Sequence, residues 1–304
     1  MAGSDPDDSQ LPAPFLTALS RRQWTVVCFV LGAALFFISG WLWYTQLYST
    51  PQRVFWGMIN NNLSARGVTR TITESQGGNS SQQIISLSFN GDVQAHSVAT
   101  IGQTGSDNQT NTVVSETIGT VSADYIRYLK ISPDDGRFAS TLNIWAKADG
   151  DGQRSNFLLE SMFGLAPVAN LTPVPRRALV DQMQSRHIYD VDYSKLVHKS
   201  EKGRDVLVYD VTLNLEGYLQ ILNNYLQTIG MPKDSQFDPS QYAGQTAAVT
   251  MTIDKLSHQL VSVAYDNSNR IETYTDYGVV DTGKLPTDTI GVDVLQKRLQ
   301  ATLQ

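Results

Sequence analysis

Residues 246–277, TAAVTMTIDKLSHQLVSVAYDNSNRIETYTDY, decide the fold class of this chain. Apolar and polar residues alternate through most of the stretch, and a period of two is typical of half-buried strands. Clusters of turn-forming residues divide it into three segments. We therefore predict an antiparallel meander, with strands near 246–254, 258–266 and 269–277.

The same alternation runs through the rest of the domain. It predicts further strands near 67–75, 82–90, 93–103, 111–119, 123–132, 141–147, 193–199 and 204–213. Helical spacing of apolar residues predicts helices near 51–63, 155–163, 174–185, 215–229 and 290–302. Runs of strands separated by helices are typical of the α+β class. The predicted fold is thus α+β, with a curved antiparallel sheet, or half-barrel, packed on helices.

Residues 24–44, WTVVCFVLGAALFFISGWLWY, precede this domain and contain no charged residue. A helix of this length spans about 31 Å at about 1.5 Å per residue, which matches a hydrocarbon core of about 30 Å. Tryptophans stand at both ends, where aromatic rings prefer the membrane interface. We predict a single transmembrane helix at 24–44, a short tail at 1–23 and a domain at 45–304.

The orientation follows from the flanking charges. Arg21 and Arg22 precede the apolar segment, and the next basic residue is Arg53. Basic residues favour the cytoplasmic side, so we expect a cytoplasmic N-terminus and an extracytoplasmic C-terminal domain. A cleaved signal peptide is the main alternative. The apolar run is longer than the usual 7–15 residues and ends in bulky Trp-Leu-Trp-Tyr, which favours a retained helix.

The composition indicates in which kind of cell and compartment the protein is found. The single cysteine, Cys28, lies inside the apolar segment, so residues 45–304 cannot form an internal disulfide. A eukaryotic extracellular domain of this size would usually contain some. We therefore expect a bacterial cell envelope protein. The net charge of −6 is opposite in sign to that of a nucleic-acid-binding surface, so no nucleic-acid partner is expected.

No motif for catalysis or cofactor binding stands out. There is no G-x-S-x-G elbow, no phosphate-binding glycine loop and no H-E-x-x-H. The four histidines are not in metal-ligand spacing: His96, His187, His198 and His258. Asp149, Asp151 and Glu160 partly match a calcium loop, but Arg154 takes the position that needs glycine, so a plain loop is favoured. We expect no enzyme activity, no metal and no cofactor.

The apolar faces of the strands leave two interpretations open. The side chains could face a filled core under the helices. Alternatively, a curved sheet could be only partly filled on its concave face and hold a lipid-sized cavity. In that second case the ligand-binding residues, near the helix at 215–229, are expected to be Leu207, Tyr209, Val211, Met251, Val261 and Val263.

Three short motifs resemble a known superfamily. V-T-M-T-I-D-K at 249–255, Q-L-V-S-V at 259–263 and Y-T-D-Y-G at 274–278 with Leu285-Pro286 look like the last strands of the LolA/LppX-like carriers of lipids and lipoproteins in the bacterial envelope. Asp124-Tyr125-Ile126-Arg127-Tyr128 resembles their middle strands. The resemblance covers about a third of the chain. It implies a half-open antiparallel barrel around an apolar cavity, with helices as a lid.

The functional hypothesis combines these features. We expect a membrane-anchored, extracytoplasmic, non-enzymatic domain that binds a lipid or the acyl group of a lipoprotein. The expected partners are the membrane, through residues 24–44, the lipid or lipoprotein, and an envelope protein. The alternative is a sensor, regulatory or surface interaction domain with a filled core and no ligand.

Overall fold

The computed structural model describes residues 21–105, 109–133, 136–149, 157–162, 164–228 and 237–303; in the first helix, side chains are described from Phe29 onward. The chain divides into two compact units, 1–50 and 51–304. The calcium-loop candidates Asp151 and Arg154 lie outside the described residues.

The first unit contains helix α1 (Arg21–Trp43), followed by a π-helical turn, η1 (Tyr44–Tyr48). Large apolar side chains of α1 are exposed, among them Phe36 at 75% and Trp41 at 69%. The ring of Trp43 stacks on that of Tyr48, with 5.2 Å between the centroids. A search of the described part of the chain finds no helix that is both long enough and apolar enough to span a membrane.

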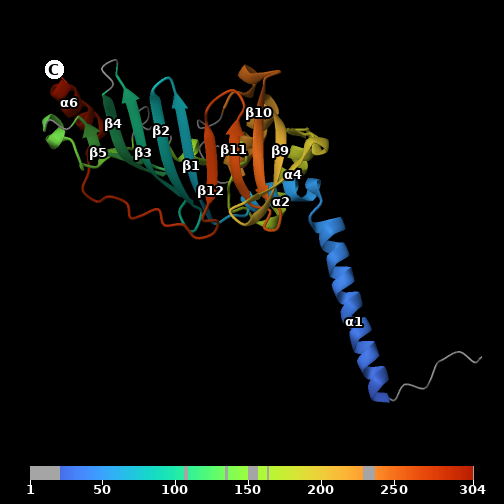
Figure 1. The fold of residues 1–304 in the computed structure, drawn as a ribbon. Helices are drawn as coiled ribbons and strands as arrows, with labels where there is room; N and C mark the ends of the chain where they lie inside the picture. The colour runs from blue at the N-terminus through green and yellow to red at the C-terminus, as the bar shows by residue number, and fades with distance from the viewer. Residues whose placement is uncertain are drawn as a thin grey trace, which may run out of the picture. The chain divides into compact units, whose positions relative to one another are not determined.

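The second unit is built on one curved sheet. Within the described residues, 13 strands join in the order β13-β6-β5-β4-β3-β2-β1-β12-β11-β10-β9-β7, and β8 pairs with β9. The first meander comprises β1 (Gly67–Gln76), β2 (Asn79–Ser88), β3 (Gln94–Thr104), β4 (Thr110–Thr120), β5 (Asp124–Ser132) and β6 (Ala146–Ala148). The second comprises β7 (Tyr189–Val191), β8 (Val197–Glu201), β9 (Arg204–Asn214), β10 (Thr246–Asp254), β11 (Leu260–Tyr265) and β12 (Ile271–Thr275). The two meanders join where β1 pairs antiparallel with β12, near the middle of the sheet (Figure 1).

The tight turn between β1 and β2 shows why the chain folds back here. Gly77 and Gly78 both have positive φ, at 58° and 87°. A two-residue hairpin loop needs this conformation, which glycine adopts without steric cost. The two strands then pair along their full length, from Gly67 with Ser88 to Gln76 with Asn79.

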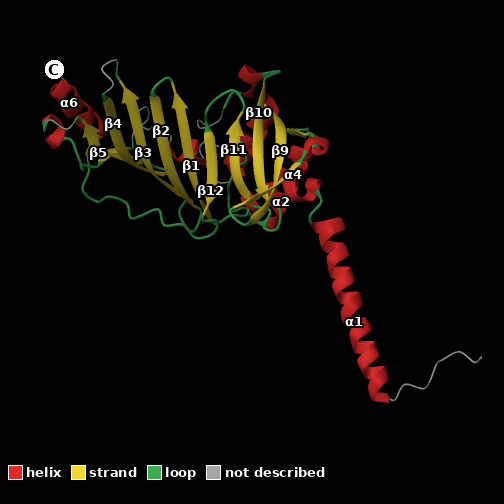
Figure 2. Ribbon diagram, viewed as in Figure 1, coloured by secondary structure: helices red, strands yellow, loops and turns green. Residues whose placement is uncertain are grey.

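In its described residues this unit has five α-helices: α2 (Pro51–Asn62), α3 (Phe157–Met162), α4 (Pro173–Ser185), α5 (Leu215–Thr228) and α6 (Val292–Leu303). Apolar side chains of α2 to α5 form one core cluster with residues on one face of β1, β2 and β9 to β12. We call this the inner face of the sheet and the opposite one the outer face. In Figure 2, α2 and α4 lie at the β9–β10 end of the sheet, and α6 lies at the β4–β5 end.

The prediction of an α+β fold with a large curved antiparallel sheet is confirmed. Two details of the strands were predicted wrongly. The segment 193–199 is not one strand, because Asp192 accepts a hydrogen bond from Ser194 N and begins a 3-10 turn, η3 (Tyr193–Lys195). The segment 141–147 is a strand only from Ala146, because a 3-10 helix, η2 (Arg137–Ser140), and an isolated bridge at Leu142 precede it. In addition, the very short β13 (Ile290–Gly291) pairs parallel with β6.

Candidate functional site

Five of the six predicted ligand-binding residues lie together in the core. Leu207, Tyr209 and Val211 on β9, Met251 on β10 and Val263 on β11 are all buried within the core cluster. The ring of Phe55 on α2 lies 5.7 Å from that of Tyr209, whose hydroxyl donates to the carbonyl of Pro51 at 3.0 Å. None of the five hollows described below is lined by these residues. A ligand contact here stays a prediction.

Val261 lies apart from the other five. The register between β10 and β11 shifts at this point, since Thr252 pairs with Ser262 but Ile253 pairs with Leu260. Val261 is therefore the extra residue of a β-bulge, which changes the direction of its side chain. It is half-buried and outside the core cluster, and it borders two shallow hollows of about 310 and 400 Å3 together with Arg204. Unlike the other five, Val261 is not part of the core cluster, and a ligand contact at Val261 stays a prediction.

The inner face has a hollow over β1 to β3, where the helices cover it less. This hollow has a volume of about 400 Å3. We call it the polar hollow; its lining includes Arg70, Glu74, Gln83, Ile85, Phe157, Ser161 and Arg270. Its polar side chains come from β1, β2, the start of β12 and α3, and Phe157 is its apolar contribution from α3.

A buried ionic cluster forms the floor of the polar hollow. Glu272 is fully buried, and its Oε1 accepts hydrogen bonds from Arg70 Nη2 at 2.8 Å, from Arg270 Nε at 3.0 Å and from Tyr265 Oη at 2.9 Å. Its Oε2 accepts from Tyr274 Oη at 2.8 Å. The carboxylate is thus fully satisfied, which is what permits its burial.

Charge interactions within this cluster hold both partners ionised. Burial alone would raise the pKa of Glu272, but Arg70 and Arg270 lower it below its ordinary value. Burial alone would lower the pKa of Arg70, but Tyr274 and Glu272 raise it. Two guanidinium groups share one carboxylate here, so the cluster carries one positive charge in excess.

Two side chains of α3 complete the polar hollow. The hydroxyl of Ser161 is buried, and among the described residues it has no hydrogen-bond partner. Arg70 Nη1 donates to the Ser161 carbonyl at 3.3 Å, which ties α3 to the ionic cluster. The pKa of Glu160 is raised by partial burial and by the nearby Asp124. The hollow therefore offers both donors and acceptors to a polar group.

A second hollow, of about 260 Å3, lies on the same face between β4, β5 and α6. We call it the apolar hollow because most of its lining is apolar, including Ile126, Phe157, Val292, Leu295 and Leu299; Thr117, Asp124 and Gln296 also border it. Register places Ile126 on the inner face, since it follows the pairs Ile85–Ser97, Ser97–Thr117 and Thr117–Ile126. The apolar hollow and the polar hollow share Phe157.

Gly119 explains why α3 lies so close to the sheet at this point. A Cβ atom at Gly119 would lie 2.7 Å from the backbone nitrogen of Leu158 and 2.9 Å from Cδ1 of Phe157. Only glycine permits this approach. Asp124 Oδ2 accepts from Phe157 N at 3.4 Å, which holds the start of α3 above β5. These two residues fix Phe157 between the two hollows.

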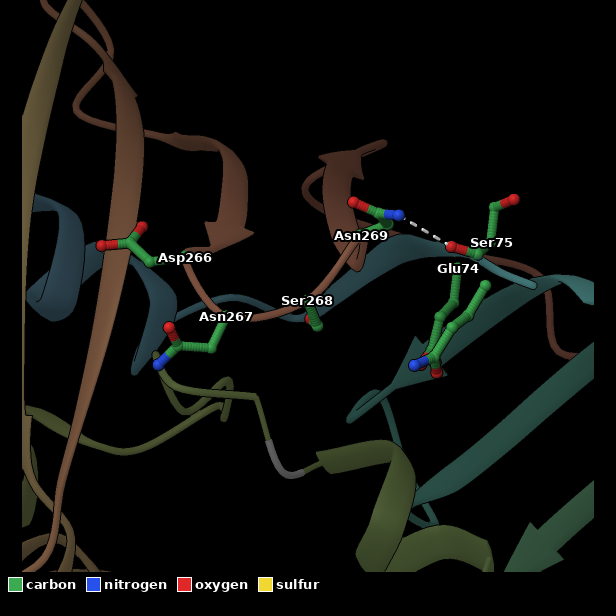
Figure 3. A pocket seen from close by; sticks show the side chains of 7 residues that line it. Glu74, Ser75, Asp266, Asn267, Ser268 and Asn269 are labelled. Atoms are coloured by element: carbon green, nitrogen blue, oxygen red, sulfur yellow. Dashed lines mark hydrogen bonds between the residues drawn. The ribbon is translucent and has the colours of Figure 1, made fainter.

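A further hollow of about 410 Å3 lies at the hairpin tips, between the β1–β2 and β11–β12 turns. Figure 3 shows the Asn269 amide reaching the Ser75 carbonyl, a hydrogen bond of 3.0 Å, while Asp266 and Asn267 lie on the far side from Glu74. Its polar side chains do not converge on a common point. It is a notch between turns and not a site.

The candidate catalytic and metal residues are dispersed. His96 and Arg127 both pair with Glu116 on the outer face. His187 follows the last turn of α4, and His258 is buried in the β10–β11 turn. Asp149 pairs with Lys147 at 2.7 Å. In the described part of the chain, no group of three or more His, Cys, Asp or Glu side chains could hold a metal ion.

The sequence analysis missed Arg70 and Glu272. The signal was present: Arg70 stands between Val68 and Ile72 on the apolar face of its strand, and Glu272 alternates with Tyr274. A charge on an apolar strand face has to find a partner of opposite sign. The search for motifs along the chain could not pair residues that are so far apart in sequence.

Comparisons with known proteins include a structural likeness. No family model and no curated protein matches the sequence. The fold is similar to the crystal structure of LprF from Mycobacterium bovis, with a TM-score of 0.43, 13% identity, and coverage of 78% of this chain and 96% of that one. At this identity and TM-score, the likeness says nothing of what this chain binds.

Proposed function

We propose that the domain binds an amphipathic lipid on the inner face of its first meander. The acyl part occupies the apolar hollow, and the polar end faces Arg70, Ser161 and Arg270. The observation that carries this proposal is the position of Phe157, which borders an apolar hollow on one side and a polar hollow on the other. Amphipathic ligands need this pairing of environments.

The energetics favour an acyl chain as the apolar part. Each methylene group that leaves water contributes about 0.8 kcal/mol, so a chain of several methylenes offsets the cost of ordering it. The two hollows together fall within the size range of ligand pockets, roughly 300–1,000 Å3. Glu272 holds the guanidinium groups of Arg70 and Arg270 before any ligand arrives, which lowers the cost of orienting a polar end.

The proposal is one of binding and not of catalysis. Glu272, a fully buried carboxylate, is engaged by two arginines and two tyrosines. Those bonds favour its ionised, hydrogen-bonded form and leave it poorly placed to exchange protons with a substrate.

The binding site is tested by a pair of matched substitutions. Ile126→Asp places a charge in the apolar hollow, whereas Ile84→Asp places the same charge on the outer face, where Ile84 is 43% exposed. We expect Ile126→Asp to reduce labelling by a photoactivatable C16 fatty acid at least about tenfold, because the chain would desolvate the charge. The melting temperature should change little, since Ile126 is only half-buried.

Ile84→Asp should label like the unmodified protein. Equal loss of labelling in both variants, or labelling that maps away from peptides bordering Phe157, would contradict the proposed site.

We further propose that residues 24–44 anchor the domain in the cell membrane of a bacterium, with the N-terminus in the cytoplasm. The support is the charge-free sequence, the flanking Arg21 and Arg22, and the exposed apolar side chains of α1. Protease added to intact spheroplasts should digest residues beyond about 45 and spare the N-terminus. Detection of a mature chain that begins after residue 40 would contradict the anchor.

A second candidate function is a protein interaction domain without a ligand. It is favoured by one observation, the close burial of Leu207, Tyr209, Val211, Met251 and Val263 under the helices. In that case no lipid labels the domain, and neither Ile126→Asp nor Ile84→Asp has an effect on labelling.

A further inference from the structure

The helix α6 is held less firmly than the other helices of its unit. Of its side chains, Leu295 is 2% exposed, and the other described ones are exposed or half-buried. Neither cluster of buried apolar residues in the described part of the chain includes Leu295. Its neighbours are Val292 and Leu299, which also border the apolar hollow. The helix therefore covers a hollow and does not pack on a filled core.

Polar contacts do not fix α6 either. Its side chains form an ion pair within the helix, Asp293 with Lys297 at 3.9 Å, and Thr302 Oγ1 donates to the Arg298 carbonyl at 2.8 Å. Among the described residues, no side chain of α6 forms a hydrogen bond or ion pair with another element. Elements with few buried apolar contacts open locally at low cost.

The chain that leads to α6 is held near its start, where Tyr277 packs against the core cluster, and only lightly beyond Gly283. After β12, residues 276–289 run without helix or strand along one end of the strands to the edge of the sheet (Figure 1). Gln94 Nε2 donates to the Thr282 carbonyl at 2.9 Å, and Gly278 N donates to the Gly67 carbonyl at 3.0 Å. The last attachment before α6 is β13, which consists of two residues paired with β6.

We propose that β13 and α6, residues 290–303, form a lid that lifts from β6 as one unit and opens the apolar hollow to an acyl chain. This inference rests on the proposed function for its purpose, but the motion itself is tested without a ligand. Lifting breaks the β13–β6 pairing, including the bond from Ile290 N to the Trp145 carbonyl at 2.9 Å, and exposes Leu295. The core under α2, α4 and α5 is left intact.

A disulfide between β13 and β6 would lock the lid. Ile290 and Ala146 are register partners, so their Cα separation of about 4.8 Å is within the range that a disulfide spans. The control is a disulfide between Thr71 and Thr273, register partners on β1 and β12 outside the lid. Both pairs, I290C/A146C and T71C/T273C, are made in the full chain with C28S and placed in lipid nanodiscs.

Hydrogen exchange without added ligand is the first measurement. We expect the amides of α6 to exchange at least tenfold faster than those of β9 and β10, and oxidation of I290C/A146C to slow them at least tenfold. Oxidation of T71C/T273C should not change them. The lid proposal would be overturned if the amides of α6 exchanged as slowly as those of β9, or if the I290C/A146C disulfide did not slow their exchange.

The time course of labelling by a photoactivatable C16 fatty acid is the second measurement. Oxidised I290C/A146C should label at least tenfold more slowly than the same protein after reduction, while the control pair labels equally in both states. Equal labelling rates for the locked and reduced lid would overturn its role in ligand access. A lid that opens and locks in the exchange experiment, with no labelling in any state, would support the lid and reject the lipid-binding function.

Discussion

At the scale of single residues, Glu272 is central to how the elements of residues 51–304 are held together. A fully buried carboxylate is costly, and here two arginines and two tyrosines compensate it. Arg70 also reaches the Ser161 carbonyl, so the same cluster joins β12, β1 and α3. One acidic residue thus links the two meanders to the helix that carries Phe157.

Replacing this carboxylate should destabilise the domain strongly. Glu272→Gln leaves the guanidinium of Arg70, which is 2% exposed, buried without its counter-charge, and we expect a loss of about 3–5 kcal/mol in the free energy of unfolding. Urea denaturation measures this. The control is Lys195→Met, which removes an exposed ion pair with Asp192 and should leave stability nearly unchanged.

Glu272 also predicts how the stability of the domain changes with pH. Because the pKa of Glu272 is lowered from 4.5 in the folded chain, the unfolded chain binds the proton first as pH falls. Its contribution is complete above about pH 4.5 and is lost as pH falls through the folded-state pKa. Glu272→Gln should therefore be less acid-sensitive than the unmodified domain. A variant that loses stability with acid as steeply as the parent would show that this carboxylate is not stabilising.

At the scale of elements, local patterns predicted most of the structure. The alternation in β10 and β9 and the spacing in α5 give those elements to within a residue or two of where they lie. Each of these segments carries its own apolar face, so that sequence periodicity and tertiary burial agree.

The elements that were missed depend on pairing instead of on local pattern. β13 has two residues and exists because Ile290 meets Ala146 on a distant part of the chain. The bulge at Val261 arises from how β11 fits β10, since alternation alone places Val261 on the same face as Val263. Neither feature is visible in the sequence of a single segment, because each depends on a strand that lies elsewhere in the chain.

Across the whole unit of residues 51–304, the two halves of the sheet differ in how they are filled. The second meander carries α2, α4 and α5 on its inner face and has a closed core there. The first meander carries α3 and, at its edge, α6, with the polar and apolar hollows beside Phe157. The apolar residues predicted to line a cavity belong to the closed half, because strand alternation shows which face is apolar but not whether helices fill it.

The difference between the two meanders supports the central claim, which is that the first meander holds a lipid on its inner face. Native mass spectrometry of the full chain, purified from its own host and released from nanodiscs, tests it most directly. We predict an added mass in the range of a lipid that persists after detergent is stripped from the chain and is absent from the Ile126→Asp variant but present in Ile84→Asp. Bare protein mass in all three samples, or the same added mass on all three, would contradict the claim.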